Sequence, residues 1–413
     1  MLGLIIEILY NLSVLVLFLI IIYKISRERY LIVSSLVFWF IFFYFCYLAF
    51  PCLFIEEINK RWFFSQLTID ISRCIVFIYN LSFSFILFSF CYGDKTLSEA
   101  FLLKQRCLFV YQAALFIEVV STCVILFAVL KLINIRSGIS GLRAYFLIRE
   151  AAESLEAKYH IRMILYLLIS SSFYLFWYKR RIRYFLPLFG IIIFETLAGK
   201  RTTAFIVLLY LYVIYAISRK KLALKIIIPI MSVLLIGVLF VRAKALESEM
   251  GLSVVFGEFF ETFTTLPYIV EKDLFGKGFL LERVLSDYTF ASFLPGMLKV
   301  NIISYLSSGS EIARYVGKGY GLGSNFISEQ IFEFGLVGYI TVFFVPLIII
   351  YFDKMLKGIN NLIIKIVFIF QLRLYVREGI SQFMISFYII ILYQSFFYFL
   401  RRKNVVFYSK VNQ

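Results

Sequence analysis

Charged residues are scarce in this sequence. Of its 413 residues, 16% are Asp, Glu, Lys or Arg, whereas 62% are hydrophobic and 20% are aromatic. A typical soluble domain has about 25% charged residues, so this composition excludes a soluble globular protein. Apolar stretches of roughly 15–25 residues recur from end to end, and most are long enough to span a bilayer. We therefore predict an all-α polytopic membrane protein with about eleven transmembrane helices and no separate soluble domain.

Histidine and paired cysteines are almost absent. The one histidine, His160, stands at the edge of an apolar run and argues against Ser-His-Asp catalysis. The six cysteines are scattered singly without C-x-x-C spacing, so we expect neither a metal site nor a disulfide framework. The chain also lacks a P-loop, a Rossmann glycine pattern, H-E-x-x-H and G-x-S-x-G. Any enzyme here would work without a nucleotide fold, and we expect no cofactor.

Basic residues outnumber acidic ones, which gives a net charge of +17. They cluster between the apolar runs, as the positive-inside rule expects of cytoplasmic loops, and not in a patch suited to nucleic acid. Such clusters follow the first run, at Lys24 and Arg27, and the last, at Arg401 and Arg402. We predict an outer N-terminus, a cytoplasmic C-terminus and one integral membrane domain over residues 1–413. Because the first run has no basic leader or small-residue cleavage site, we expect it to be retained as a span.

Alternation of the apolar runs predicts the spans and the segments between them. Two segments are predicted to lie on the outer side. Residues 134–160 are too polar for insertion and have amphipathic helical spacing over Leu142–Lys158. Residues 242–325 have too many apolar and aromatic residues to be disordered and should pack as short helices and loops. At the outer end of the third span, Asp70 and Arg73 are expected to pair. The predicted spans are about 2–23, 31–50, 69–91, 107–133, 161–178, 185–198, 204–218, 226–241, 326–352, 359–375 and 380–400.

Two neighbouring spans, 185–198 and 204–218, are short. Basic residues flank both on the cytoplasmic side, so the turn Gly199–Thr203 between them should be recessed into the bilayer from the outer side. Lys200 and Arg201 would then be cations at membrane depth, which cost a few kcal/mol or more when unpaired. A functional role is the default interpretation of such charges, and pairing with Glu195 is the structural alternative.

The stretch Arg314–Gly338 is rich in glycine and leads into a helix. Ser324 or Asn325 would cap that helix, and Asn325, Glu329 and Glu333 recur every four residues on one face. Backbone N–H groups of the turn and the helix N-terminus would attract an anion. Alternatively, the stretch is a re-entrant bend whose carboxylates pair with loop lysines. The glycines of the turn are Gly317, Gly319, Gly321 and Gly323.

Cationic residues gather in the outer leaflet of this topology. Arg373 and Arg377 are one helical turn apart at the end of the tenth span, and Arg242 stands where the eighth span ends. The planar guanidinium group matches phosphate oxygens and stays charged, so these residues indicate a phosphate group carried by a lipid. Chance clustering within one leaflet is the alternative. The candidate phosphate ligands are Lys200, Arg201, Arg242, Arg314, Arg373 and Arg377.

Four motifs, in this order, resemble those of one family. They are KRRIRY before a short apolar helix, LAGKRTTAFIVLLYLYVIY followed by SRKK, GKGYGLGSNFISEQIFEFGLVG after the large outer segment, and LYVREG near the C-terminus. Over residues 178–400 the chain resembles the Wzy O-antigen polymerases, also called oligosaccharide repeat unit polymerases. The first 170 residues resemble that family only in hydropathy.

This resemblance implies a GT-C-like, inverting, metal-independent glycosyltransferase of the bacterial inner membrane, with its active site facing the periplasm. Donor and acceptor would both be glycans on undecaprenyl pyrophosphate, joined during lipopolysaccharide biosynthesis. By the family motifs, Arg201, Arg242 and Arg377 would hold the pyrophosphate. A polysaccharide chain-length regulator is implied as a partner. The related O-antigen ligases use a histidine in the large outer loop, and the absence of histidine from 242–325 favours a polymerase.

The acceptor hydroxyl needs a group that takes its proton. Glu329, Asp287 and Glu261 are the candidate catalytic carboxylates, and Glu329 is preferred because it directly follows the Gly-rich turn, with Glu333 as its rival on the same face. Two other functions stay open. A flippase for the same lipid-linked glycan is less favoured because the charges gather in one leaflet. A purely structural membrane protein would leave the recessed cations unexplained.

Overall fold

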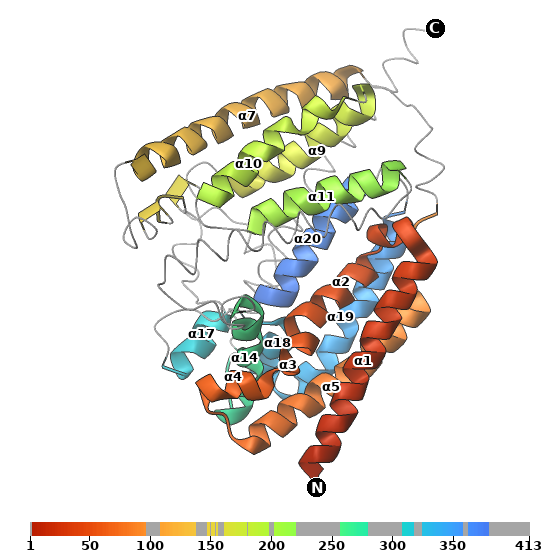
Figure 1. Cartoon of the computed structure of the whole chain (residues 1–413), viewed down its shortest axis with the longest axis vertical. Helices are drawn as coiled ribbons and strands as arrows, with labels where there is room; N and C mark the ends of the chain where they lie inside the picture. The colour runs from red at the N-terminus through yellow and green to blue at the C-terminus, as the bar shows by residue number, and fades with distance from the viewer. Residues whose placement is uncertain are drawn as a thin grey trace. The chain divides into compact units, whose positions relative to one another are not determined.

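The regular secondary structure of the computed structural model is helical in every part of the chain that it describes (Figure 1). This confirms the predicted all-α class. Within the described residues, four helices are long and apolar enough to cross a membrane: Gly3–Ser34, Gln66–Phe90, Tyr111–Ile135 and Leu336–Met355. The described residues are 2–95, 108–137, 147–148, 150–152, 154–155, 161–179, 181–197, 202–219, 257–279, 308–317, 324–357 and 362–379.

The chain divides into two compact units, which are considered separately below. Unit 1 comprises Met1–Thr96 and Phe256–Leu392, and unit 2 comprises Leu97–Val255 and Tyr393–Gln413. The helices of unit 1 are α1 (Leu2–Glu28), η1 (Arg29–Ser34), α2 (Leu36–Tyr44), η2 (Phe45–Ala49), α3 (Phe50–Cys52), α4 (Ile55–Trp62), α5 (Gln66–Phe90), α14 (Gly257–Glu271), α17 (Ser308–Tyr315), α18 (Phe326–Phe334), α19 (Leu336–Met355) and α20 (Leu362–Glu378). Those of unit 2 are α7 (Leu108–Ser137), α9 (Ile161–Lys179), η3 (Ile182–Phe185), α10 (Leu186–Leu197) and α11 (Thr202–Arg219).

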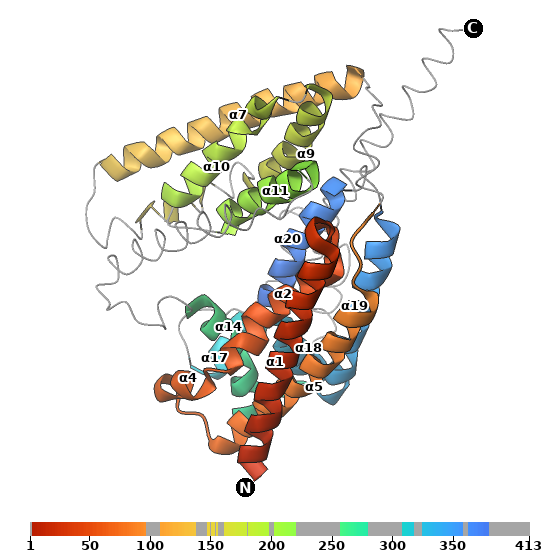
Figure 2. The ribbon, with the colours of Figure 1, turned by 45° about the vertical axis from the view of Figure 1, so that its right-hand side comes forward.

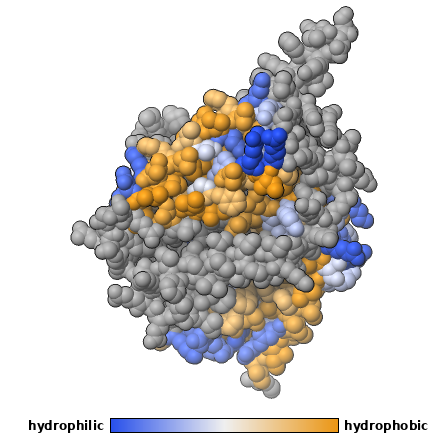
Figure 3. All heavy atoms as spheres, turned by 45° about the horizontal axis from the view of Figure 1, so that its top comes forward, coloured by the Kyte–Doolittle hydropathy of each residue, from blue (hydrophilic) through white to orange (hydrophobic). Residues whose placement is uncertain are grey.

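Helix α1 illustrates how unit 1 separates its core from its apolar surface. Tyr10, Leu17 and Ile21 recur at helical spacing and are buried, whereas Leu4 and Leu12 on the opposite face are 62% and 56% exposed. The buried face packs along α5, and Figure 2 shows the two helices side by side. Exposed apolar side chains also cover much of the described surface in Figure 3. Such a surface is expected where helices face lipid.

The predicted ninth span, 326–352, is wrong as a single helix. The structure divides it into α18 and α19 at Gly335, whose φ of +58° and ψ of −134° favour glycine. The two helices meet so tightly that a methyl group on Gly338 would lie 2.2 Å from the carbonyl oxygen of Gln330. α18 is therefore a short separate helix, and α19 alone is a candidate span.

The expected pair between Asp70 and Arg73 is also wrong. Arg73 Nη2 lies 3.1 Å from Glu56 Oε1 and Nη1 lies 3.8 Å from Glu7 Oε2, whereas Asp70 accepts a hydrogen bond from Gln66 at 3.2 Å. Carboxylates of α1 and α4 reach Arg73 because the starts of α1 and α5 lie at the same end of unit 1. Arg73 therefore pairs with carboxylates of other helices and not with Asp70, its neighbour in the sequence.

The described part of the outer segment 242–325 consists of short helices, as predicted, and α14 is fixed to the start of α5. Glu271 at the end of α14 accepts hydrogen bonds from the Thr68 hydroxyl and from Ser65, whose Oγ is 2.9 Å from Glu271 Oε2. These hydrogen bonds lower the pKa of the Glu271 carboxyl, and the hydrogen bond from Thr68 has the largest effect. The anchoring holds α14 in place beside α18.

In unit 2, α10 and α11 coincide with the two short apolar runs of the sequence. The turn between them, with Lys200 and Arg201, lies outside the described residues, as do the predicted spans 226–241 and 380–400. Within 134–160, residues 134–137 form the end of α7, and the chain is also helical at 147–148, 150–152 and 154–155, where Ile148, Ala152 and Leu155 are buried. That spacing agrees with the predicted amphipathic helix.

Candidate functional site

Helix α18 forms the centre of the candidate site, and all of its residues from Phe326 to Glu333 are buried. Asn325 is the residue that caps it, since its side chain accepts a hydrogen bond of 2.9 Å from the backbone N–H of Ser328. The capping prediction is thus confirmed for Asn325. Glu329 and Glu333, one and two turns further on, are 1% and 0% exposed.

Helix α14 and the loop after it hold α18 at both ends. The Asn325 amide nitrogen lies 2.9 Å from the carbonyl oxygen of Thr262 and 2.9 Å from Thr265 Oγ1, which is 3.0 Å from Ser328 Oγ. At the other end, the backbone N–H of Gly278 donates to the carbonyl oxygen of Phe332 at 2.8 Å. These hydrogen bonds fix the position of α18, and therefore of its carboxylates, against α14.

The C-terminal end of α20 lies directly on Glu329. Gly379 has φ of +86°, and a methyl group placed on it would lie 2.2 Å from Glu329 Oε1. One turn earlier, the Tyr375 ring lies 5.3 Å from that of Phe326, and its hydroxyl interacts electrostatically with Glu329 and Glu333. Only a residue without a Cβ fits between α20 and this carboxylate.

Two of the predicted phosphate ligands lie on this same helix. Arg373 is buried, and its guanidinium carbon lies 5.9 Å from the centre of the Tyr47 ring, which in turn lies 4.8 Å from the ring of Phe259 on α14. Arg377 is partly buried two residues before Gly379. The fold therefore brings both arginines of α20 to the region of unit 1 that contains Glu329.

The other predicted site residues fall into three groups. Glu261 is half-buried on α14, one turn before Thr265, and Ser324 is buried beside the cap. Arg314 is exposed at the end of α17, and Gly317 beyond it has φ of +73° with open space around it, as expected of a glycine turn. Outside the described residues are Lys200, Arg201, Arg242, Asp287, Gly319, Gly321 and Gly323.

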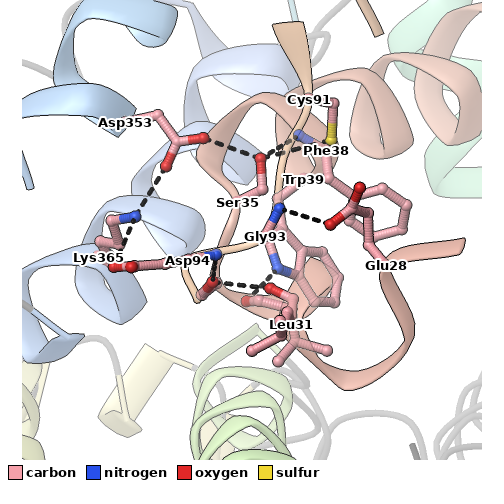
Figure 4. Close-up of polar contacts among 12 residues, drawn as sticks. Glu28, Leu31, Ser35, Phe38, Trp39, Cys91, Gly93, Asp94, Asp353 and Lys365 are labelled. Carbon is pink, nitrogen blue, oxygen red and sulfur yellow. Dashed lines mark hydrogen bonds and ion pairs between the residues drawn. The ribbon is translucent and has the colours of Figure 1, made fainter. Parts of the chain in front are cut away.

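A second buried polar cluster lies between α2, α19 and α20 and was missed in the sequence (Figure 4). Lys365 Nζ lies 2.9 Å from Asp353 Oδ1 and 4.0 Å from Asp94 Oδ2, and Ser35 Oγ donates to Asp353 Oδ2 at 2.8 Å. None of these four side chains is more than 8% exposed. The only sign of this cluster in the sequence is a single lysine, Lys365, inside an apolar run.

The ends of α1 and α5 complete this region. Lys24 Nζ donates to the carbonyl oxygen of Cys91 at 2.9 Å. The backbone N–H of Gly93 donates to Glu28 at 3.2 Å, as Figure 4 shows. The ends that meet here are those predicted to share the cytoplasmic side. The cluster and Arg73 lie at opposite ends of α5.

The described residues contain no group of three or more His, Cys, Asp or Glu side chains that could hold a metal ion. Comparison of the chain with protein-family models, curated proteins and solved structures gives no match.

Proposed function

We propose that the protein is a membrane glycosyltransferase that polymerises lipid-linked oligosaccharide repeat units, as its resemblance to the O-antigen polymerases implies. In this proposal the chain has about eleven spans in a GT-C-like arrangement in a bacterial inner membrane, with the buried site of unit 1 facing the periplasm. Its substrates are two glycans on undecaprenyl pyrophosphate.

One observation carries the proposal. The stretches GSNFISEQIFEFGLVG and LYVREG, two of the motifs behind the resemblance, contact each other through Glu329 and Gly379. The first stretch contributes the buried Glu329 and Glu333, the second contributes the partly buried Arg377, and the buried Arg373 directly precedes the second. Burying ionisable groups in a membrane protein costs free energy, and such groups commonly mark functional sites. Their convergence here therefore supports a site of chemistry.

The proposed chemistry uses a carboxylate as the base and arginines as ligands of the leaving group. Glu329 takes the proton of the acceptor hydroxyl, whose oxygen forms a bond to the anomeric carbon of the donor glycan. The bond from that carbon to the phosphate oxygen breaks, and undecaprenyl pyrophosphate leaves. Attack opposite to the leaving group inverts the anomeric centre.

Arginines stabilise the leaving group. Arg377 and Arg373 of α20 would hold the pyrophosphate as its charge develops, since preorganised guanidinium groups match phosphate oxygens. Arg201 and Arg242 stay candidate ligands by the resemblance alone. Asn325 and Thr265 act indirectly, because they fix α18 and hence Glu329.

The test uses purified protein in liposomes with the lipid-linked repeat unit of the producing organism and follows glycan length on gels. We expect Glu329→Gln and Arg377→Ala to lower the polymerisation rate by about 100-fold or more, with the protein still folded in the membrane. Glu57→Gln, on exposed α4, is the control and should retain normal rates. Normal glycan lengths with both site variants would refute the proposal.

A flippase for the same lipid-linked glycan is the second candidate. The buried cluster of Lys365, Asp353 and Asp94 favours it, since charges inside membrane helices often mark transport pathways. The two functions separate in the same liposomes. Translocation of the repeat unit without any lengthening would support the flippase.

A further inference from the structure

Unit 2 contains a carboxyl group that the proposed reaction does not use. Glu118 lies on α7, within the candidate span Tyr111–Ile135, and is 6% exposed. Its Oε2 atom lies 3.4 Å from Ser171 Oγ of α9. Among the residues that the structure describes, no lysine or arginine comes within ion-pair distance of Glu118. An ionised carboxylate is costly at such a position.

The hydrogen bonds around Glu118 do not satisfy an ionised carboxylate. The Ser171 hydroxyl has one hydrogen but two acceptors, the carbonyl oxygen of Leu168 at 3.2 Å and Glu118 at 3.4 Å. The nearby Thr122 hydroxyl donates to the backbone carbonyl of Glu118 at 2.6 Å and not to its carboxylate. Since an ionised carboxylate has about four acceptor positions, one long and shared donor leaves it largely unsolvated.

A proton removes this mismatch. The protonated carboxyl would donate to Ser171 Oγ, and Ser171 would donate to the carbonyl oxygen of Leu168, so that each hydroxyl hydrogen has one acceptor. We propose that Glu118 of unit 2 is a buried proton-binding site and that its protonated carboxyl donates a hydrogen bond to the Ser171 hydroxyl oxygen. Buried carboxyls in membrane spans commonly serve proton relays, and a proton bound at Glu118 has no part in the proposed glycosyl transfer.

A second hydroxyl pair lies beside this site. Tyr210 of α11 has its hydroxyl 3.3 Å from Ser172 Oγ of α9 and interacts electrostatically with Glu118. Ser172 also donates to the carbonyl oxygen of Ile169 at 3.1 Å. The groups of α9 and α11 that interact with Glu118, Ser171 and Tyr210, are thus neutral hydroxyls, which cannot neutralise a carboxylate.

The remaining buried acid in the described part of unit 2 is Glu195 of α10. The Tyr184 hydroxyl just before α10 lies 3.4 Å from that of Tyr111 near the start of α7, and Gly190 packs against Ile125, about two turns beyond Glu118. α10 therefore runs parallel to α7, and Glu195 lies further towards the end of α7 than the proposed site. Glu195 serves as the matched control.

The experiment is infrared spectroscopy of the full-length protein in lipid bilayers. Spectra in H₂O and D₂O are compared between wild type, Glu118→Gln and Glu195→Gln. We expect a protonated-carboxyl C=O band that shifts in D₂O, is lost in Glu118→Gln and is retained in Glu195→Gln. Ser171→Ala should keep this band but shift its frequency, because the carboxyl loses its acceptor.

Two results would overturn the proposal. An unchanged band in Glu118→Gln would show that the signal comes from another carboxyl. Loss of the wild-type band on addition of sodium chloride, but not choline chloride, at constant pH would assign the site to a sodium ion. Should Glu118→Gln fail to fold, Ser171→Ala decides, since an unshifted band there also contradicts the assignment.

Discussion

Gly379 ends α20 in the left-handed region of backbone conformation and contacts Glu329 at the same time. The sequence presents it only as the last residue of VREG, and the resemblance drew attention to the preceding arginine. The positive φ and the close approach of the carboxylate both require the absence of a Cβ. A glycine of this kind can be identified only when the partner that approaches it is known.

We predict that Gly379→Ala lowers the polymerisation rate by about 100-fold, because the new methyl group displaces Glu329 and a shift of about 1 Å in a catalytic group has effects of that order. The left-handed backbone adds a stability cost of roughly 1–2 kcal/mol. The measurements are the glycan-lengthening rate in liposomes and the melting temperature of the purified variant.

The control for this variant is Gly317→Ala. Gly317 has a similar φ of +73°, but a methyl group there meets no atom within 4 Å. It should therefore show the backbone cost without the loss of rate. Equal rates for the two variants would mean that the contact between Gly379 and Glu329 does not position the carboxylate.

At the scale of elements, α18 depends on α14. Asn325 joins them by two amide hydrogen bonds, and Thr265 accepts one of these while contacting Ser328. α18 has nine residues, too few for a stable isolated helix, so its position must come from tertiary contacts.

We predict that Thr265→Val destabilises the protein by about 1–3 kcal/mol, because the amide of Asn325 loses an acceptor in a buried setting. Thr264→Val is the matched control, since the buried Thr264 hydroxyl bonds only to the carbonyl oxygen of Glu261 in its own helix. Melting temperatures in detergent measure both. A loss in Thr264→Val as large as that in Thr265→Val would contradict the role of Thr265 in joining the helices.

Sequence patterns predicted which segments are helical better than they predicted how the helices break and pair. The run 326–352 contains Glu329 and Glu333 near its start, but its division at Gly335 depends on tertiary packing, with Gly338 against Gln330 as the close contact. The cap at Asn325 agrees with the sequence because a cap follows from local spacing. The partners of Arg73 come from helices α1 and α4, and sequence distance alone favoured Asp70.

At the scale of the whole molecule, the described helices of unit 1 bring together parts of the chain that are far apart in sequence. Ser35 and Asp353 are hydrogen-bonded at 2.8 Å across 318 positions. The alternation of spans predicts that these ends share one side of the membrane. It does not predict that Lys365 and Asp94 meet there, because side-chain contact depends on the rotation and tilt of each helix.

The buried cluster yields a last prediction, which concerns the stability of unit 1. Lys365→Met leaves Asp353 buried without its cation, and breaking a buried ion pair in this way costs about 3–5 kcal/mol. We expect a clear fall in melting temperature and a partial recovery in Lys365→Met combined with Asp353→Asn, which removes the charge of Asp353. Lys60→Met is the control: its pair with Glu57 is 2.7 Å long, shorter than the 2.9 Å of Lys365 with Asp353, but it is exposed to solvent. Since water screens exposed pairs, Lys60→Met should leave the melting temperature unchanged. Equal effects of the two single variants would mean that burial does not make the Lys365 cluster important for stability.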